Sequence, residues 1–507
     1  MAGKYKSPGV YIEEINAFPQ SVAEVATAIP AFIGYTEKAI RDGQSLLNTP
    51  VKITSILDYI AFFGEDFNAK FDILEPELNE TRPIVTINGT DKIIDYVTNN
   101  KAFMFKSLKF FYANGGNECY ILSVGTYENQ SSVDIDVDAL LGISSGSQPF
   151  EGLNALKNEQ EPTMVVIPDA VNLSASYCYS LYQKVLEHCA EMQNRIAIFD
   201  IHSGFKARSI VGSQDDIITN FRENIGTEHL SYGVAYYPWL NTNIQQNRDL
   251  TFEHINLELS ALSNLLPETT TTTLINNYID SSNTSQDNKR LLHLELLKAS
   301  PTYGTIINGI HEVLNLLPPS AAMAGIYSRV DAQRGVWNAP ANISVAAVVS
   351  PSVQISNSDQ ENLNVDSISG KSINAIRIFP GRGILVWGAR TLDGNSGEWR
   401  YINVKRTIIT IKESIKLAIS SFVFEPNTTT TWVSVKNRIE SYLNALWRDG
   451  AFVGSSPREA FGVQIGLGST MTSSDILEGK MKITVFVAMI KPAEFIVMNF
   501  VQQMQES

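Results

Sequence analysis

The sequence predicts a multidomain protein of mixed α/β and α+β class, in which a parallel-type α/β sheet region is followed by a C-terminal α+β region. A length of 507 residues is enough for several domains with a large buried core. The contents of 44% hydrophobic and 18% charged residues are ordinary for a folded protein. Apolar strand runs alternate with helical patterns in the middle of the chain, and the last third mixes strands with a long helix.

The middle of the chain predicts a parallel sheet covered by helices on both faces. Three continuous apolar runs there have the length of buried strands: residues 164–167, 195–201 and 232–239. Ser174 is the expected N-cap of a helix that runs to about Met192, and Ser213 is the expected N-cap of a helix over 214–225. Apolar strands that alternate with helices in this way form parallel sheets.

The N-terminal part of the chain alternates short strands and helices. The expected elements are a strand at 31–34, a helix at 53–63, a hairpin at 83–97, a helix at 102–112 and a strand at 119–124. Asn88 and Gly89 would supply the positive φ angles of the tight hairpin turn.

A polar stretch at residues 126–160 is expected to be a surface insertion. Asp134, Asp136 and Asp138 alternate in it, which favours a solvated strand face. A calcium loop needs glycine at its sixth position, where Ala139 stands, so the calcium interpretation is rejected.

The C-terminal third contains the clearest helix of the chain. Apolar residues between Trp432 and Trp447 fall on one helical face, and Gly450 suits a left-handed cap. Two strands are expected to close the chain, at 481–490 and 494–501, and the second is apolar on both faces. An uncovered terminal strand of this kind would promote aggregation, so we expect it to be buried between other strands.

Two further polar regions precede this helix. Residues 241–315 are expected to be helical, with Thr269–Thr273 as a loop between helices, and Ser356–Lys371 is the next polar stretch.

Charge and cysteine content exclude several classes of partner and site. The net charge of -14 argues against nucleic acid, because phosphate binding requires a basic surface. The three cysteines, Cys119, Cys178 and Cys189, form neither a disulfide framework nor a zinc motif, which favours a reducing compartment. The first residues do not form a signal-peptide pattern, and no run approaches the ~20 apolar residues that span a bilayer. We therefore expect assembly in the cytoplasm and no direct membrane insertion.

The residues alone leave open an α/β enzyme as the alternative. Asp169, Asp200 and His202 lie at predicted carboxyl ends of parallel strands, where such proteins place ligands, and they could hold a metal or serve acid–base chemistry. An Asp after a buried strand is also a common helix cap or turn former. We favour that interpretation, and expect no catalytic residue, no cofactor and no metal.

Two short motif matches fail on their context. Residues 142–146 read G-x-S-x-G, but Gln148 and Pro149 follow where a hydrolase elbow needs a helix. Residues 369–372 read SGKS, but a phosphate loop would need glycine at 365, where Val365 stands.

Six runs dense in Pro, Gly, Arg and aromatic residues carry a family resemblance. They are SPGVYIEEI (7–15), AIPAFIGYTEKA (28–39), LLPPSAAMAGIYSRVDAQRGVWNAPAN (316–342), INAIRIFPGRGILVWGARTLD (373–393), WRYINVKR (399–406) and FVFEPN (422–427). In this order they resemble the contractile tail sheath proteins of phages, R-type tailocins and extracellular contractile injection systems. The sequence leaves open which of these three groups it serves.

The resemblance implies a structural role rather than an enzymatic one. A tail sheath subunit assembles with itself as hexameric rings stacked in a helix, surrounds an inner tube protein, and contracts to drive the tube through a target membrane. Baseplate and cap or terminator proteins are the other implied partners. The chain would be part of a phage tail or of a phage tail-like particle that can be extracellular after release. A non-contractile adhesin or shell protein is a third class that we keep open.

The resemblance also divides the chain and assigns its exchange strands. The expected divisions are an arm at 1–20, an N-terminal sheath region with its insertion at 21–160, an α/β domain at 161–345, a C-terminal sheath domain at 346–480 that includes part of 21–50, and an arm at 481–507. Without the family, residues 1–20 would be read as a frayed terminus; with it, we expect strands donated to neighbouring subunits. The residues assigned to this exchange are Val10, Tyr11, Ile12, Glu13, Phe495, Ile496, Val497, Met498 and Phe500.

Overall fold

The structure is a computed structural model that describes residues 25–77, 80, 82–143, 151–213, 215–281 and 285–495. It divides into two compact units. The large unit comprises residues 26–410 and 491–507, and the small unit comprises residues 1–25 and 411–490. The division falls inside helix α13 (Ile402–Ile419), which therefore has residues in both units.

A nine-stranded mixed sheet forms the centre of the large unit, in the order β14-β17-β16-β11-β10-β9-β1-β8-β4 among the described residues. The strands are β1 (Pro30–Thr36), β4 (Val51–Ile53), β8 (Cys119–Thr126), β9 (Met164–Val166), β10 (Ile196–Asp200), β11 (Gly233–Tyr237), β14 (Ile343–Ser344), β16 (Asn374–Phe379) and β17 (Gly383–Trp387). The run from β8 to β16 is parallel throughout, whereas β4, β17 and β14 pair antiparallel at the two sides. The predicted parallel sheet is thus confirmed.

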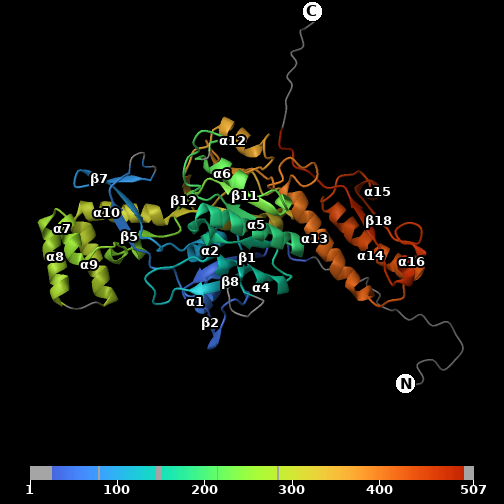
Figure 1. The fold of residues 1–507 in the computed structure, drawn as a ribbon, viewed down its shortest axis with the longest axis horizontal. Helices are drawn as coiled ribbons and strands as arrows, with labels where there is room; N and C mark the ends of the chain where they lie inside the picture. Colours follow the sequence, from blue (N-terminus) through green and yellow to red (C-terminus); the bar gives the residue numbers. More distant parts are fainter. Residues whose placement is uncertain are drawn as a thin grey trace, which may run out of the picture. The chain divides into compact units, whose positions relative to one another are not determined.

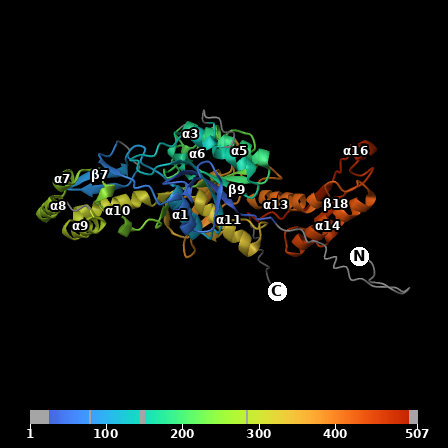
Figure 2. The same ribbon diagram turned by 90° about the horizontal axis from the view of Figure 1, so that it is seen from below.

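Helices cover both faces of this sheet because its strands are apolar on both sides. In β1, Phe32 joins one buried cluster, while Ala31 and Ile33 join another on the opposite face. The first face packs against α1 (Ile56–Phe63), α2 (Met104–Ala113) and α11 (Ser320–Arg334). The second packs against α3 (Val137–Leu141), α4 (Gly152–Ala155), α5 (Ala175–Met192), α6 (Ile217–Asn224) and the end of α12 (Asn357–Asn364). Figure 2 shows α3, α5 and α6 on one side of this sheet and α1 and α11 on the other.

A third core in the large unit joins two distant parts of the sequence. The three-stranded sheet β5 (Phe71–Leu74), β7 (Thr90–Tyr96) and β6 (Ile84–Ile87) packs against α10 (Pro301–Leu314). Helices α7 (Leu259–Leu265), α8 (Thr269–Ser281) and α9 (Gln286–Ala299) complete the cluster, as seen beside α10 in Figure 1. The predicted hairpin turn is confirmed, since Asn88 and Gly89 have φ angles of 51° and 74°.

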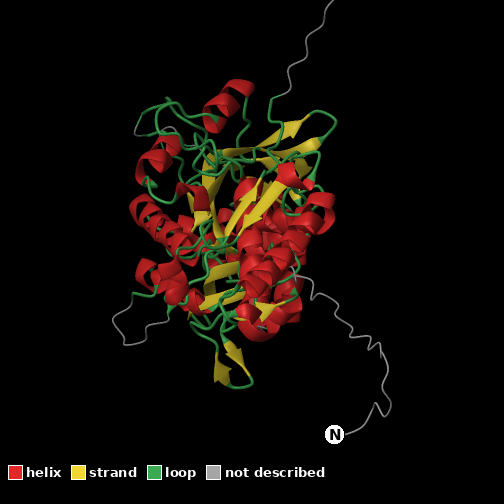
Figure 3. Cartoon of the chain, turned by 90° about the vertical axis from the view of Figure 1, so that its right-hand side faces the viewer, coloured by secondary structure: helices red, strands yellow, loops and turns green. Residues whose placement is uncertain are grey.

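Short strands occupy the remaining connections of the large unit. β12 (Leu240–Thr242) lies between β13 (Leu316–Leu317) and β15 (Val348–Pro351). The hairpin of β2 (Ile40–Arg41) and β3 (Gln44–Ser45) extends away from the central sheet (Figures 1 and 3).

The small unit is organised by helix α14 (Thr429–Arg448), which confirms the predicted amphipathic helix. Its buried face consists of Val435, Ile439, Tyr442, Leu443 and Leu446. The unit also contains the C-terminal part of α13, α15 (Pro457–Ala460), α16 (Ser473–Leu477), and an antiparallel pair of strands, β18 (Phe461–Gln464) and β19 (Thr484–Val487).

Three local predictions are wrong. Residues 269–273 begin helix α8 instead of forming a loop, because Thr271 and Ile275 turn into the third core. Ser213 is not the N-cap of α6; that position belongs to Asp216, whose carboxylate accepts a hydrogen bond from the Thr219 amide.

The third wrong prediction concerns the insertion at 126–160. Asp136 caps helix α3 and Asp138 lies inside it, so these carboxylates do not lie on a strand face. Leu140 and Leu141 of that helix are buried in the second core, so much of this segment is integral to the fold. The expected closing strand at 481–490 is shorter, covering only β19.

Candidate functional site

The strand-exchange assignment falls mainly outside the described residues. Eight of its nine residues lie there: Val10, Tyr11, Ile12, Glu13, Ile496, Val497, Met498 and Phe500. Phe495 is described, belongs to no strand and is 71% exposed. The structure does describe the residues from which the two terminal segments start, and both starting points are held by buried charged groups.

The C-terminal anchor is a buried ion pair between Arg390 and Glu494. The guanidinium donates to the Glu494 carboxylate from Nε at 2.9 Å and from Nη2 at 2.6 Å. Asn364 Nδ2, at 2.6 Å, and the Tyr401 hydroxyl, at 3.1 Å, donate to the same carboxylate. Four donors from three different segments thus converge on one side chain, one residue before the described chain ends. Lys491 adds a bond from its ammonium group to the Gly397 carbonyl oxygen at 2.8 Å.

The backbone of Arg390 is held in place by the strand that the INAIR motif forms. Asn374, the first residue of β16, donates from Nδ2 to the Arg390 carbonyl at 2.8 Å and accepts from the Arg390 amide at 2.8 Å. Arg390 Nη1 also donates to the Asn364 carbonyl at 3.1 Å. The side chain is only 4% exposed, so every donor that faces inward has to find an acceptor in the protein.

The electrostatics of Glu494 favour its ionised form. Burial raises the pKa of the carboxyl, but the hydrogen bonds from Arg390 and Asn364 outweigh burial and hold the pKa below its ordinary value. The Glu494 side chain is 19% exposed, so water reaches this pair to some extent. Bidentate contacts of this type fix direction as well as distance.

The N-terminal anchor is built around Arg406. Its guanidinium donates to Asp331 at 2.5 and 2.9 Å and to the Thr27 carbonyl oxygen at 2.9 Å. It also stacks over the Tyr327 ring at 4.8 Å. Burial lowers the pKa of Arg406, but Asp331 outweighs that effect and the net pKa is raised, so the guanidinium stays charged.

The backbone that follows Thr27 is fixed by two hydroxyl groups. Ser328 Oγ of α11 donates to the Ala28 carbonyl at 3.0 Å. Thr163 Oγ1 donates to the Thr27 carbonyl at 3.0 Å and accepts from the Ile29 amide at 2.9 Å. The chain therefore enters β1 from a position determined by main-chain contacts.

A small sheet with open edges is the second feature that bears on strand exchange. β18 and β19 pair only with each other among the described residues, through Phe461–Val487 to Gln464–Thr484. Each of these strands therefore has one edge without a strand partner in the described chain. A two-stranded sheet is marginally stable by itself, and its unpaired amide and carbonyl groups are a template for further strands.

The three residues of the enzyme alternative have structural partners. Asp200 accepts from the Ser320 amide at 2.8 Å and from the Ser320 hydroxyl at 2.5 Å, which caps the start of α11. Asp169 accepts from the Phe103 amide at 2.7 Å just before α2. The His202 ring contacts the Leu173 carbonyl at 3.1 Å. Each side chain is thus engaged with a different segment.

Burial is the main cause of the pKa shifts of these three groups. It raises the pKa of Asp169 to about 6 and that of Asp200 to about 7, and it lowers the pKa of His202. Perturbed pKa values also occur at active sites, but here the carboxylates accept bonds at helix starts. Within the described ranges, no group of three or more His, Cys, Asp or Glu side chains could hold a metal ion.

Two family models match this chain. A model described as the phage tail sheath protein central domain matches residues 146–392, and one described as the phage tail sheath C-terminal domain matches residues 395–503. Together they span more than half of the sequence. The chain belongs to the phage tail sheath family.

Two curated relatives agree over shorter stretches. A prophage major tail sheath protein of Pseudomonas aeruginosa (strain UCBPP-PA14) is 26% identical over 137 residues, which is 27% of this chain. The tail sheath protein of Burkholderia phage BcepMu is 27% identical over 182 residues, which is 34% of this chain. In both cases the match spans 35% of the relative's own length.

Solved structures match along the whole chain. The sheath complex of an extracellular contractile injection system, PVC, in its contracted state is 25% identical, covers 99% of both chains and has a TM-score of 0.59. The helical sheath of the anti-feeding prophage (AFP) in the contracted state is 26% identical, covers 98% of this chain and 100% of that one, and also has a TM-score of 0.59. The predicted fold class and family are confirmed.

No helix among the described residues has the length and hydropathy needed to cross a bilayer.

Proposed function

We propose that this chain is the structural subunit of a contractile sheath that surrounds an inner tube and drives it through a target membrane. The observation that carries the proposal is the match of nearly the entire chain to subunits of contracted sheaths. Rings of six are supported by similarity to a chain of the AFP baseplate described as 6-fold symmetrised, with 26% identity and a TM-score of 0.59. Stacked rings in a helix repeat one pair of unlike surfaces without closure.

Exchanged terminal strands would join the subunits. The β18–β19 sheet has two edges available in the described chain. Each subunit also has two terminal segments with β-prone sequences, so one segment could pair with each edge. Backbone pairing of this kind depends little on side chains, so the link can persist while the bodies it joins change orientation.

The two anchors would transmit force between exchanged strands and the large unit. Arg406 holds the carbonyl of Thr27, and Arg390 holds the side chain of Glu494, so each segment starts from a buried charged contact. A segment that started from a loose loop would yield under load before moving the body. Both anchoring arginines belong to the large unit, which would therefore move as the body that the strands pull.

The remaining expected partners belong to the same proposal. The inner tube protein, the baseplate and the cap or terminator proteins would contact the sheath at its inner surface and its two ends. We further propose that assembly occurs in the cytoplasm, that the chain does not bind nucleic acid, and that its role is structural rather than enzymatic. The net charge of -14 and the engagement of Asp200 with Ser320 support the last two points.

Electron microscopy of the purified chain tests the proposal. Negatively stained tubes with a helical repeat are expected from the chain alone or together with its tube protein. A small discrete particle that shows catalytic turnover would contradict the sheath function and favour the α/β enzyme.

A further inference from the structure

One aromatic side chain in the small unit is presented to solvent in an unfavourable backbone conformation. Phe424 follows the short helix at Ser420–Phe422, between α13 and α14, and is 102% exposed. Its φ angle is 72°, in the left-handed region that bulky residues rarely adopt. Burial alone would never select this arrangement, since both the exposed ring and the strained backbone cost free energy.

The loop that carries Phe424 is held firmly by α14. Arg438 Nη1 donates to the Ala418 carbonyl at 3.1 Å and to the Ser421 hydroxyl at 2.9 Å, and its guanidinium stacks over the Phe422 ring at 4.7 Å. On the other side of the loop, Trp432 Nε1 donates to Asn427 at 2.6 Å. The projecting ring is therefore presented on a rigid support, which reduces the entropy that binding would cost.

Charged and apolar neighbours give this projection a distinct chemistry. Val423 is 62% exposed, so an aliphatic and an aromatic side chain project together. Glu425 comes next, and its carboxylate has no ion-pair partner in the described part of the chain. We define Val423, Phe424 and Glu425 as the knob: an apolar tip with one negative charge beside it.

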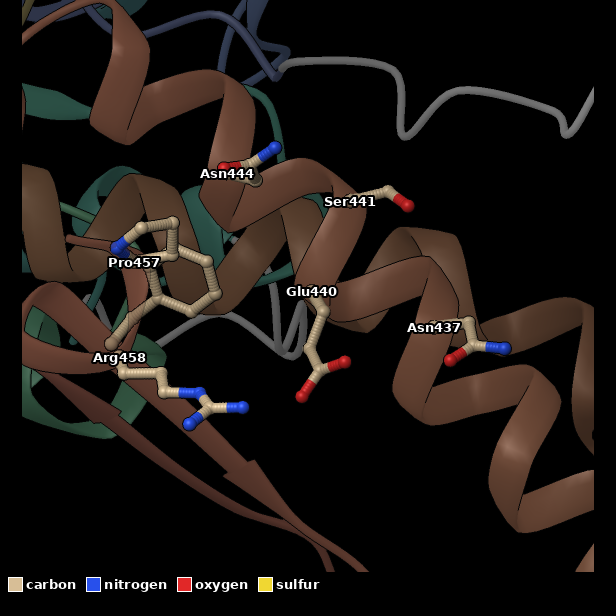
Figure 4. A pocket seen from close by; sticks show the side chains of 7 residues that line it. Asn437, Glu440, Ser441, Asn444, Pro457 and Arg458 are labelled. Carbon is tan, nitrogen blue, oxygen red and sulfur yellow. The ribbon is translucent and has the colours of Figure 1, made fainter.

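The same unit contains a groove of complementary chemistry. It has a volume of about 450 Å³ and lies between the middle of α14 and the start of α15 and β18. Its lining residues are Asn437, Glu440, Ser441, Asn444, Pro457, Arg458 and Phe461 (Figure 4). Pro457 and Phe461 supply apolar surface, and Arg458 supplies a positive charge without an ion-pair partner among the described residues. Glu440 lies 3.7 Å from Lys436, which offsets its negative charge.

We propose that the knob of one subunit inserts into this groove of the next subunit, with Phe424 on Pro457 and Phe461 and Glu425 paired with Arg458. A second copy of the chain fits because a helical array needs two unlike surfaces on each subunit, and the small unit presents both. Aromatic and arginine side chains are also the residue types that dominate interface energetics. This contact rests on the proposed self-assembly, to which it adds a side-chain interface separate from the exchanged strands.

Replacing Phe424 separates an interface role from a role in folding. Phe424→Gly removes the ring and relieves the left-handed strain, so the isolated subunit should melt no lower than the parent. The yield of sheath tubes should nevertheless fall by about tenfold or more, because the lost contact recurs at every subunit. Phe424→Tyr keeps an aromatic ring and should assemble like the parent. Normal assembly by Phe424→Gly would overturn the proposal.

Charge reversal tests which surface receives the knob. Glu425→Arg and Arg458→Glu should each reduce assembly, because each places like charges opposite one another. The double variant Glu425→Arg/Arg458→Glu restores opposite charges and should recover most of the tubes. Both side chains are exposed, so circular dichroism and melting should match the parent for all three variants. A double variant that assembles no better than either single variant would overturn the pairing.

Cysteine cross-linking tests the contact directly in the assembled sheath. Cys119, Cys178 and Cys189 are all buried, so introduced surface cysteines would be the reactive ones. Two differently tagged variants, Glu425→Cys and Arg458→Cys, should form a mixed covalent dimer on oxidation when they assemble together. Failure of the parent to form tubes would defeat the sheath function itself, whereas parent tubes that yield no mixed dimer would defeat only this contact. A cross-link from Glu425→Cys to the tube protein would also overturn it, in favour of the tube as the occupant.

Discussion

Arg390 and Glu494 lie 104 positions apart in the sequence and meet in a bidentate ion pair with a shortest distance of 2.6 Å. The pair fixes the last described residues near the start of β16, because Asn374, the first residue of that strand, bonds to both the amide and the carbonyl of Arg390. A terminal segment that begins at Glu494 therefore has a defined starting point and direction. The N-terminal segment has a comparable starting point at Arg406.

Arg390→Ala should uncouple the C-terminal segment from the large unit. The substitution leaves the largely buried Glu494 carboxylate without its main partner, which costs about 3 kcal/mol of stability. This value is at the lower end of the usual range because Glu494 is 19% exposed. Thermal melting measures the loss, and microscopy should show few or no tubes. Glu494→Gln removes the charge but keeps an acceptor, so it should cost less, and the double variant should be less damaging than the sum of the two. Additive losses would contradict the pairing.

The same ion pair predicts a pH dependence. The folded-state pKa of Glu494 is depressed, so its contribution is fully present above the ordinary pKa of the carboxyl and is lost as the pH falls through the folded value. Tubes should therefore lose C-terminal attachment in acid, and Glu494→Gln tubes should lack this part of the dependence. The melting temperature, measured as a function of pH below about 5, tests this pH dependence.

Arg406→Ala should free the backbone at the start of β1. Asp331 is 5% exposed and would remain buried without a counter-ion, at a cost of about 3–5 kcal/mol. Hydrogen–deuterium exchange should accelerate at the amides of residues 27–29. Arg406→Met combined with Asp331→Leu removes both charges and should recover much of the stability but not the contact to Thr27. Unchanged exchange in both variants would show that Thr163 and Ser328 suffice.

Deletion of residues 1–18 should leave a folded subunit that does not form tubes. These residues precede the contacts at Thr27, and a terminal segment of this length has no core of its own. Circular dichroism should be unchanged, and sedimentation should show single subunits or short oligomers. Long tubes from the shortened chain would contradict strand donation by the N-terminal segment.

Val497→Asp should give soluble protein without sheath. The segment after Glu494 is apolar on both faces by sequence, so a buried strand there would gain an unpaired charge, which costs several kcal/mol. The folded bodies should be unaffected, because the substitution lies beyond the Arg390 anchor. Val497→Ile changes only volume and should assemble. If Val497→Asp tubes are as abundant as those of the parent, the segment is solvent-exposed on at least one face.

Asp169→Asn, Asp200→Asn and His202→Ala should each retain assembly and contraction, with losses of about 1 kcal/mol as expected for capping and turn contacts. Burial raises the pKa of Asp200 to about 7. The stability that the protonated carboxyl contributes is therefore fully present below the ordinary pKa of the group and is lost as the pH rises through 7. The stability of Asp200→Asn relative to the parent should therefore be highest at pH 8 and lowest near pH 4. Loss of all function in a folded variant would revive the enzyme alternative.

Much of the fold could be predicted because its signals are local. The β9, β10 and β11 strands are short apolar runs, and α14 has one continuous apolar face, so the period of the sequence identifies them. Helix α8 could not be predicted in this way. Its first residues are threonines, which favour helix only weakly, and packing of Thr271 and Ile275 into the third core decides the outcome.

The anchors could not be predicted from the sequence. Arg390 lies in a run that resembles the family, but its partner Glu494 follows Lys491 and Pro492 in a segment read only as a strand. No spacing rule connects two residues that are separated by a whole structural unit. The open edges of β18 and β19 could not be predicted for a different reason: β18 is four residues long and contains a glycine, which gives a weak strand pattern.

The contact between Arg406 and Thr27 has a consequence for how such chains diverge. The guanidinium binds the carbonyl oxygen of residue 27 and not its side chain, and Thr163 and Ser328 likewise bind main-chain oxygens. Any L-amino acid that leaves this backbone path undisturbed could therefore stand at position 27. Among homologous sheaths, substitutions should accumulate at the position of Thr27 while the Arg406–Asp331 pair is retained, so that subunits whose terminal segments differ in sequence can keep the same attachment.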